Sequence, residues 1–528
     1  MKHPLAILFV ILSLAVTIWA QQTNERAANN PLDCAILLFS KDSSRFGLSD
    51  FLTRALFRSG RDSDAIEIAR SNKVLFGGFE ELSVLGLERL RTGDKVAAIK
   101  FANAAFDDYS AEVDGVSADR LFPLVDLMIG LGKPEFALKI VEQQGEPEEK
   151  AKILVELAKA YFKYGDKDAS LNVLETAITV FDSHDYRDMF DRADQFIKLG
   201  EKARALDLVS KIENDDVILS DKLNLDKVYC QLFFRFMELG DYKRAASNWE
   251  QIANNDDVSA RLEFSSGMMR GRRFAEAERV LANVSQEELE QYQVGREVVK
   301  QYLELGKTAS AERSAKVISV SNDDEDQQDA FLQIADHYIK LKENVAAAAI
   351  LDLAFRRASK IVFEHEQGQN NGASPGTRKW IYLKNISTRY IQIGKIEQAY
   401  TAIAAIYSDH ELARERFATG TARFARENAK RLSSTRINQI YVAALKAIGE
   451  MDSEYRVEII VNQAEAAAII GKPDKAADIL SEMFANRSDR FPVEYALILA
   501  GEVFEKYHLQ TNDSLRNSLT KIIEDAED

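Results

Sequence analysis

The chain of 528 residues lacks most of the patterns that mark a reaction centre in a sequence. None of its six histidines belongs to a His-Glu-x-x-His motif, the spacing at which two histidines of one helix bind zinc. Residues 306–308 have the Gly-Lys-Thr ending of a phosphate-binding loop, but Gln301 stands where that loop needs its first glycine. We therefore expect no catalytic residue, no bound metal and no cofactor, and interpret the chain as a non-enzymatic protein.

Basic residues and long apolar runs are also scarce. The 68 lysines and arginines are outnumbered by 84 acidic residues, which gives a formal net charge of −16. So acidic a surface repels the phosphates of nucleic acids and anionic lipids. Beyond residue 20 no apolar stretch approaches the roughly 20 residues that span a bilayer. We expect no nucleic-acid partner and no membrane span in the mature chain.

The first twenty residues differ from the rest. Lys2 precedes an uncharged apolar run from Leu5 to Ala20, and polar residues follow it. This run is short for a membrane span, and Ala20 suits a cleavage site. The pattern predicts a signal peptide cleaved near Ala20, and hence a periplasmic or secreted protein. An uncleaved anchor is the alternative that stays open.

The feature that is abundant is an internal repeat. A Gly-x-x-x-x-Ala pattern recurs at intervals close to 35 residues, and two further copies keep only the alanine, after Arg272 and Lys342. The complete copies are Gly60/Ala65, Gly93/Ala98, Gly132/Ala137, Gly200/Ala205, Gly240/Ala245, Gly306/Ala311, Gly394/Ala399 and Gly471/Ala476. Another copy has Ser170 in the alanine position after Gly165. A fixed period of this length is typical of a chain built by stacking one helical unit many times.

Residues 151–182 illustrate the unit. Apolar residues recur at helical spacing on both sides of Gly165, and Asp166 or Asp168 can cap the second helix. A glycine can take the left-handed conformation that ends the first helix. The small residue five positions later allows the two antiparallel helices to approach closely.

These residues resemble the tetratricopeptide repeat (TPR) family. The family pattern has a small residue seven before the turn glycine, an aromatic residue four before it, and alanines five and twelve after it. Copies of it here are Gly86, Gly93, Ala98 and Ala105; Ala158, Tyr161, Gly165 and Ala177; and Ala335, Tyr338, Ala347 and Ala354. The proline that commonly closes this repeat is absent. The resemblance implies an all-α fold, a right-handed superhelical α-solenoid of antiparallel helix pairs.

Breaks in the repeat predict the domain organisation. The glycine- and asparagine-rich stretch before Lys379 reads as an exposed loop, and the 77 residues from Gly394 to Gly471 leave room for one unit with a degenerate turn, with helices over 411–431 and 435–449. We predict a signal peptide (1–20), an N-terminal linker (21–45), a TPR-like array (46–366), the loop (367–379), C-terminal TPR-like repeats (380–515) and an acidic tail (516–528). Because five units separate Cys34 from Cys230, we expect free thiols rather than a disulfide.

In this family the first helix of each unit lines the inner, concave surface. Alignment on the turn glycine places mainly basic residues there: Lys152, Lys159, Lys163, Arg187, Lys198, Lys227, Phe234, Arg270, Arg296 and Lys300. They predict a basic, partly aromatic groove on an acidic protein, suited to an acidic or extended peptide. The alternative is structural, because a lysine at a helix C-terminus also complements the helix dipole.

We interpret the chain as an exported scaffold that binds a protein or peptide partner on its concave face. One rival is a solenoid that binds carbohydrate or cell wall, for which Trp249 and Trp380 are the available tryptophans beyond the signal. The other is an enzyme with an unrecognised site beyond residue 380. The oligomeric state stays open.

Overall fold

The computed structural model is helical throughout the part of the chain that it describes. These residues are 22–41, 49–71, 78–111, 116–180, 186–219, 225–252, 257–291, 294–318, 325–361, 375–408, 411–449, 454–487 and 491–526, and no strand occurs among them. The chain divides into two compact units. Unit 2 is residues 79–354, whereas unit 1 combines residues 1–78 with residues 355–528. The predicted signal peptide (1–20) lies outside the described residues.

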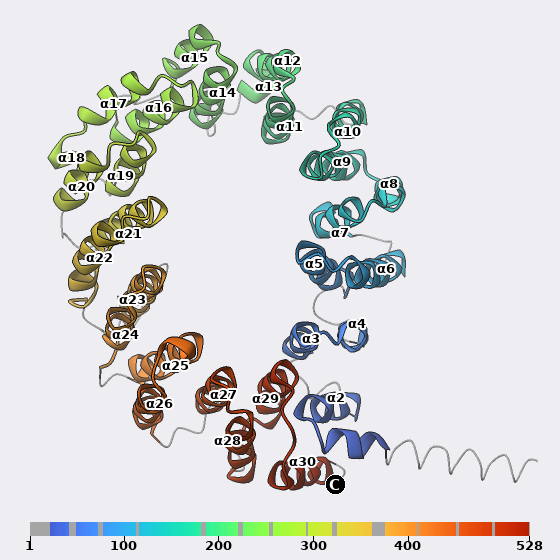
Figure 1. Ribbon diagram of the computed structural model, residues 1–528. Helices are drawn as coiled ribbons and strands as arrows, with labels where there is room; N and C mark the ends of the chain where they lie inside the picture. Colours follow the sequence, from blue (N-terminus) through green and yellow to red (C-terminus); the bar gives the residue numbers. More distant parts are fainter. Residues whose placement is uncertain are drawn as a thin grey trace, which may run out of the picture. The chain divides into compact units, whose positions relative to one another are not determined.

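Unit 2 is a row of helix pairs. Its first helices are α5 (Gly78–Arg91), α7 (Ala118–Gly130), α9 (Pro147–Lys163), α11 (Tyr186–Leu199), α14 (Leu225–Leu239), α16 (Val258–Arg270), α19 (Gly295–Glu304) and α21 (Glu325–Lys340). The second helices are α6 (Lys95–Ala111), α8 (Pro134–Gln143), α10 (Lys167–Val180), α12 (Lys202–Glu213), α15 (Tyr242–Trp249), α17 (Phe274–Ala282), α20 (Thr308–Val317) and α22 (Asn344–Ala358). Short helices α13 (Asp216–Leu219) and α18 (Gln286–Gln291) connect pairs. Within unit 2 the first helices lie along one side of the row and the second helices along the other (Figure 1).

The repeat turns adopt the conformation that the sequence predicts. Every turn glycine of the repeat has a positive φ, and so do Arg272 (58°) and Lys342 (62°), which replace glycine in two copies. In the α9–α10 turn, the Gly165 N–H donates to the Phe162 carbonyl at 3.1 Å and the Asp166 N–H to Tyr161 at 2.9 Å, the bonds of a Schellman motif. The predicted fold class, an all-α array of antiparallel TPR-like helix pairs, is confirmed.

The small residue after each turn packs where the two helices cross. All ten alanines at this position have no solvent exposure: Ala65, Ala98, Ala137, Ala205, Ala245, Ala277, Ala311, Ala347, Ala399 and Ala476. Ser170 replaces alanine because its hydroxyl donates to the Ala158 carbonyl on the facing helix at 2.7 Å. A larger side chain would separate the helices, since close-packed interiors leave no void to absorb it.

Unit 1 contains both ends of the described chain. Its helices are α2 (Pro31–Lys41), α3 (Ser49–Arg58), α4 (Asp62–Ser71), α23 (Pro375–Gln392), α24 (Ile396–Ala404), α25 (Glu411–Glu427), the 3-10 turn η1 (Ala429–Arg431), α26 (Ser434–Ile448), α27 (Glu454–Ile469), α28 (Pro473–Ala485), α29 (Val493–Tyr507) and α30 (Asp513–Asp525). Pairs α25–α26 and α27–α28 continue the repeat, and the predicted degenerate turn is η1. The tail expected over 516–528 is mostly α30, which packs on α28 and buries Leu519 and Ile523.

The N-terminal helices close on the C-terminal ones. In place of the linker expected over residues 21–45, the chain forms α2, which packs against α29 and contacts α30 (Figure 1). A Cβ added to Gly501 of α29 would lie 2.6 Å from the Leu32 Cβ and 2.8 Å from its backbone nitrogen. The Asn30 amide donates to Glu505 at 2.8 Å, and Arg516 donates to the Asn29 side chain at 2.9 Å. Unit 1 is therefore held together in part by contacts between helices from opposite ends of the chain.

Three further features bear on the predictions. Cys34 and Cys230 are both buried and free, as expected. Of the loop predicted over 367–379, residues 367–374 lie outside the described part, and residues 375–379 begin α23. Among the described helices, none combines the length and apolar character needed to cross a bilayer.

Candidate functional site

The ten residues predicted to line a groove all lie on first helices of unit 2. Helix α9 carries Lys152, Lys159 and Lys163; α11 carries Arg187 and Lys198; α14 carries Lys227 and Phe234; α16 carries Arg270; and α19 carries Arg296 and Lys300. From α7 to α21, each first helix contacts the next one. We call the surface that they share the first-helix face.

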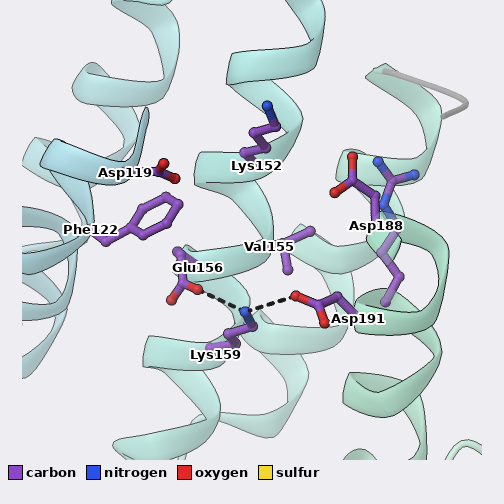
Figure 2. Close-up of a pocket in the computed structure, with 9 residues that line it drawn as sticks. Asp119, Phe122, Lys152, Val155, Glu156, Lys159, Asp188 and Asp191 are labelled. Atoms are coloured by element: carbon purple, nitrogen blue, oxygen red, sulfur yellow. Dashed lines mark hydrogen bonds and ion pairs between the residues drawn. The ribbon is translucent and has the colours of Figure 1, made fainter. Parts of the chain in front are cut away.

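A small cavity on this face lies between α7, α9 and α11. It has a volume of about 190 Å³ and is lined by Asp119, Phe122, Lys152, Val155, Glu156, Lys159, Asp188, Asp191 and Arg192. Figure 2 shows the Lys159 ammonium between two carboxylates, 2.7 Å from Glu156 on its own helix and 3.5 Å from Asp191 on α11. Burial alone would lower the pKa of Lys159, but these two acids outweigh it and raise the pKa.

The other lysines of α9 are also paired. Hydrogen bonds to Glu148 and Glu149, at 2.9 and 3.1 Å, raise the pKa of Lys152. Burial tends to lower the pKa of Lys163, but its 2.6 Å pair with Asp126 on α7 raises it. These lysines therefore stay charged, with their charges already neutralised by the protein.

The acids are the more exposed partners at two of these pairs. The Lys159 side chain is 32% exposed against 63% for Asp191, and Lys152 is 34% exposed against 54% for Glu148. A ligand that approaches these two pairs meets carboxylates first, whereas Lys163 is the more exposed member of its pair with Asp126, at 55% against 26%. This part of the face is therefore of mixed charge rather than basic.

Farther along the row, the predicted residues divide into paired and unpaired groups. Arg296 pairs with Asp329 at 3.1 Å, and Lys300 pairs with Glu297 at 3.2 Å. Lys198, Lys227 and Arg270 are exposed and form no ion pair with any described residue. Arg187 lies over the ring of its neighbour Tyr186, 5.7 Å from the centroid.

Arginine–aromatic contacts join adjacent first helices in the middle of unit 2. The Arg270 guanidinium lies 4.6 Å from the centroid of Phe234, and Arg235 lies 4.3 Å from that of Phe190. Phe234 is buried beneath its arginine, so it supports the surface rather than lining it. Arg235 also pairs with Asp194 at 2.8 Å. Such contacts are worth about 0.5–1 kcal/mol each where exposed and more where desolvated.

Part of the charge neutralisation was readable from the sequence. Glu156 precedes Lys159 by three residues and Glu297 precedes Lys300 by three, a spacing that brings side chains together on a helix. Asp126 and Asp191 belong to neighbouring helices, and only the register between helices places them beside lysines.

Signs of catalysis or metal binding are few. In the described part of the chain, no three histidine, cysteine, aspartate or glutamate side chains are placed to hold a metal ion. One Gly-x-Ser-x-Gly pattern occurs, at residues 372–376. A nucleophile elbow needs a strand before its serine, and the last described element before this pattern is the helix α22. Ser374 itself lies outside the described residues.

Comparison with known proteins gives no family. No family model matches the chain, and no curated protein matches it. Among solved structures, the APC/C hetero-tetramer Cut9–Hcn1 is similar at 11% identity and a TM-score of 0.20, covering 86% of this chain and 95% of that one. The Naa15/Naa10 complex bound to HypK-THB is similar at 13% identity and a TM-score of 0.25, covering 98% of this chain and 76% of that one. At these values, neither likeness bears on what this protein binds.

Proposed function

We propose that the protein is a non-enzymatic scaffold, exported from the cytoplasm, that binds a protein partner on the first-helix face. The observation that carries this proposal is the direct contact between successive first helices from α7 to α21. Their exposed side chains form one continuous surface, which suits a partner that makes many modest contacts.

The chemistry of the unpaired cations supports a partner with acidic groups. Lys198, Lys227 and Arg270 lie on three neighbouring first helices and keep their charges available. Repulsion from the acidic remainder of the protein would orient such a partner toward these cations. Export rests on residues 1–20, whose pattern is that of a signal peptide, and places the protein in the periplasm or outside the cell.

Site-specific photocrosslinking in the exported fraction tests the proposal. A photoreactive amino acid replaces Lys198, Lys227 or Arg270 on first helices, and Lys202, Lys243 or Arg279 at exposed positions of the following second helices serves as the matched control. We expect one recurring protein adduct from the first-helix positions and none from the controls. Adducts of equal yield from both sets, or from the second helices alone, would refute binding on this face.

One observation supports the alternative function, carbohydrate binding. Trp380 of α23 lines a cavity of about 380 Å³ in unit 1, together with Ser387, Thr388 and Thr419. An aromatic ring beside hydroxyl groups is a surface on which a sugar could bind. Trp249, by contrast, packs against Phe233 and Phe264 with centroids 4.9 and 5.0 Å apart. Retention on cell-wall polysaccharide that is lost in Trp380→Ala would favour this alternative over a protein partner.

A further inference from the structure

The largest cavity described in unit 1 is built from both ends of the chain. It has a volume of about 830 Å³, within the range of about 300–1,000 Å³ typical of ligand pockets. Residues of α3, near the N-terminus, form one wall, and residues of α25, α27 and α29 form the rest. The cavity therefore exists only while the N-terminal helices are docked on α29.

Charged residues of the two signs are paired along its wall. Arg58 of α3 pairs with Glu502 of α29, which joins the two ends of the chain. Arg423 pairs with Glu458 at 3.0 Å, and Glu465 accepts from Lys506 at 2.7 Å. Arg426 reaches the same Glu465 at 3.4 Å.

The cations are the exposed members of these pairs. Lys506 is 61% exposed against 11% for Glu465, and Arg423 is 50% exposed against 21% for Glu458. Arg58 is likewise more exposed than Glu502. Glu427, which pairs with Arg426, is the exception among the acids of the wall.

The cavity also offers apolar surface at its rim. Phe51 of α3 is half exposed, and its ring meets Tyr495 of α29 edge-on with centroids 6.3 Å apart. Val461, Leu499 and Val503 line the wall nearby. An exposed aromatic side chain held by a neighbouring ring is a rigid anchor for a bound side chain.

The dimensions favour an extended segment over a compact ligand. The four helices contact one another in the order α25, α27, α29 and α3. Packed helices lie about 8–10 Å apart, so the row is roughly 25–30 Å wide. An extended peptide rises about 3.3 Å per residue and needs about eight residues to cross it.

We propose that this cavity of unit 1 binds an extended acidic segment of a partner protein, with carboxylates on Arg58, Arg423 and Lys506 and an apolar side chain against Phe51. The inference rests on the proposed scaffold function and adds a second site for acidic groups, in unit 1, to the first-helix face of unit 2. Each arginine donates only part of its hydrogen-bonding capacity to its glutamate, so donors remain for a second carboxylate.

Fluorescence anisotropy with the mature full-length chain tests the site. The probe is a fluorescein-labelled eight-residue peptide that alternates glutamate and leucine, and a lysine–leucine peptide is its charge-inverted control. We expect saturable binding of the acidic peptide alone. The combined variant Arg58→Gln, Arg423→Gln and Lys506→Gln should weaken binding at least about tenfold, because charge-assisted hydrogen bonds are lost.

A matched variant separates this site from a general charge effect. Lys202→Gln, Lys243→Gln and Arg279→Gln remove three exposed cations from the second helices of unit 2 and should leave affinity within about twofold of wild type. Phe51→Ser breaks no ion pair and keeps the test valid if the unit 1 triple variant does not fold; we expect about fivefold weaker binding.

No binding of the acidic peptide, equal binding of the lysine peptide, or equal losses in the two triple variants would overturn this inference. If crosslinks from the first helices of unit 2 still form in that case, the unit 1 site is rejected and the proposed scaffold function is retained. If those crosslinks are absent as well, both proposals are wrong.

Discussion

Units 1 and 2 both place ion pairs between neighbouring first helices, but they differ in which member of the pair is exposed. Along the unit 1 cavity the cation is the more exposed member of these pairs, whereas in unit 2 it is the acid at some pairs and the cation at others. At α9 and α11 of unit 2, Asp191 is more exposed than Lys159. At α27 and α29 of unit 1, Lys506 is more exposed than Glu465. A partner meets the exposed charge first, so equal numbers of cations and acids give surfaces of different character. Counting charges along a helix does not reveal this order.

The units also differ in the sequence separation of the helices that pack together within them. Unit 2 is a continuous stretch of chain in which neighbours in sequence pack on one another. Unit 1 depends on a contact between helices about 470 residues apart, in which α2 packs on α29. Loop-closure entropy makes such a contact more costly to form than a local one. The cavity of unit 1, with its exposed cations, is therefore conditional on docking of its N-terminal helices.

Overpacking of the α2–α29 contact should give the largest difference in stability between equivalent substitutions in the two units. In Gly501→Val the new side chain meets the backbone of Leu32, which cannot move without separating the helices. We expect a loss of about 3 kcal/mol in the free energy of unfolding, together with early proteolysis of residues 31–71. Urea denaturation and limited proteolysis measure these two effects.

Gly145 of unit 2 is the matched control, because a Cβ there meets nothing within 4 Å. Gly145→Val should change stability by less than about 0.5 kcal/mol. Equal urea midpoints for the two variants would show that α2 docks on α29 without close packing.

The repeat was predictable because each turn is determined by residues that lie close together in the sequence. The recurring alanine, five positions after each turn residue, located two turns that lack glycine. Their turn residues, Arg272 and Lys342, have the left-handed φ that this turn requires. The last turn lacks both the glycine and the alanine of the repeat. His508 takes the glycine position, with a φ of 51°, and Asp513 takes the alanine position. Helix α29 there packs on α2 instead, a partner from the other end of the chain. Periodicity carries no information about such a contact.

The candidate surface was predictable only in part for a similar reason. Alignment on the turn glycine correctly assigned all ten residues to first helices. It could not show that Asp126 lies against Lys163 or that Phe234 lies beneath Arg270, because these contacts depend on the register between neighbouring helices. The cavity of unit 1 combines Phe51 and Arg58 with residues beyond 420, and no motif in the sequence links these segments.

Removal of one acid from each unit should give a smaller but clear difference. Glu465 is largely buried and accepts from Lys506 and Tyr507 at 2.7 and 3.1 Å. Glu465→Gln leaves these donors without their carboxylate and should cost about 2 kcal/mol, below the 3–5 kcal/mol of a fully buried pair. Glu156→Gln in unit 2 breaks a same-helix pair with Lys159 and should cost less than about 1 kcal/mol. Urea denaturation of both variants tests the order; a larger loss for Glu156→Gln would contradict it.

The smallest expected effect has opposite signs in the two units. Burial raises the pKa of Glu502 in unit 1 above the ordinary value of 4.5, so folding favours its protonated form. That contribution is complete below pH 4.5 and is lost as pH rises through the folded pKa. Glu149 in unit 2 accepts from the backbone N–H of Ala118, which lowers its pKa, so its contribution is present above pH 4.5 and is lost as pH falls.

Thermal unfolding at pH 7.5 and pH 4.0 separates the two cases. At pH 7.5, Glu502→Gln should raise Tm slightly and Glu149→Gln should lower it, whereas at pH 4.0 the Glu502 variant should match wild type. The reason is that a neutral side chain removes the cost of burying a charge at residue 502 but removes a favourable hydrogen bond at residue 149. If Glu502→Gln instead lowers Tm at pH 7.5, its pair with Arg58 outweighs burial, and the carboxylate itself holds the N-terminal helices on α29.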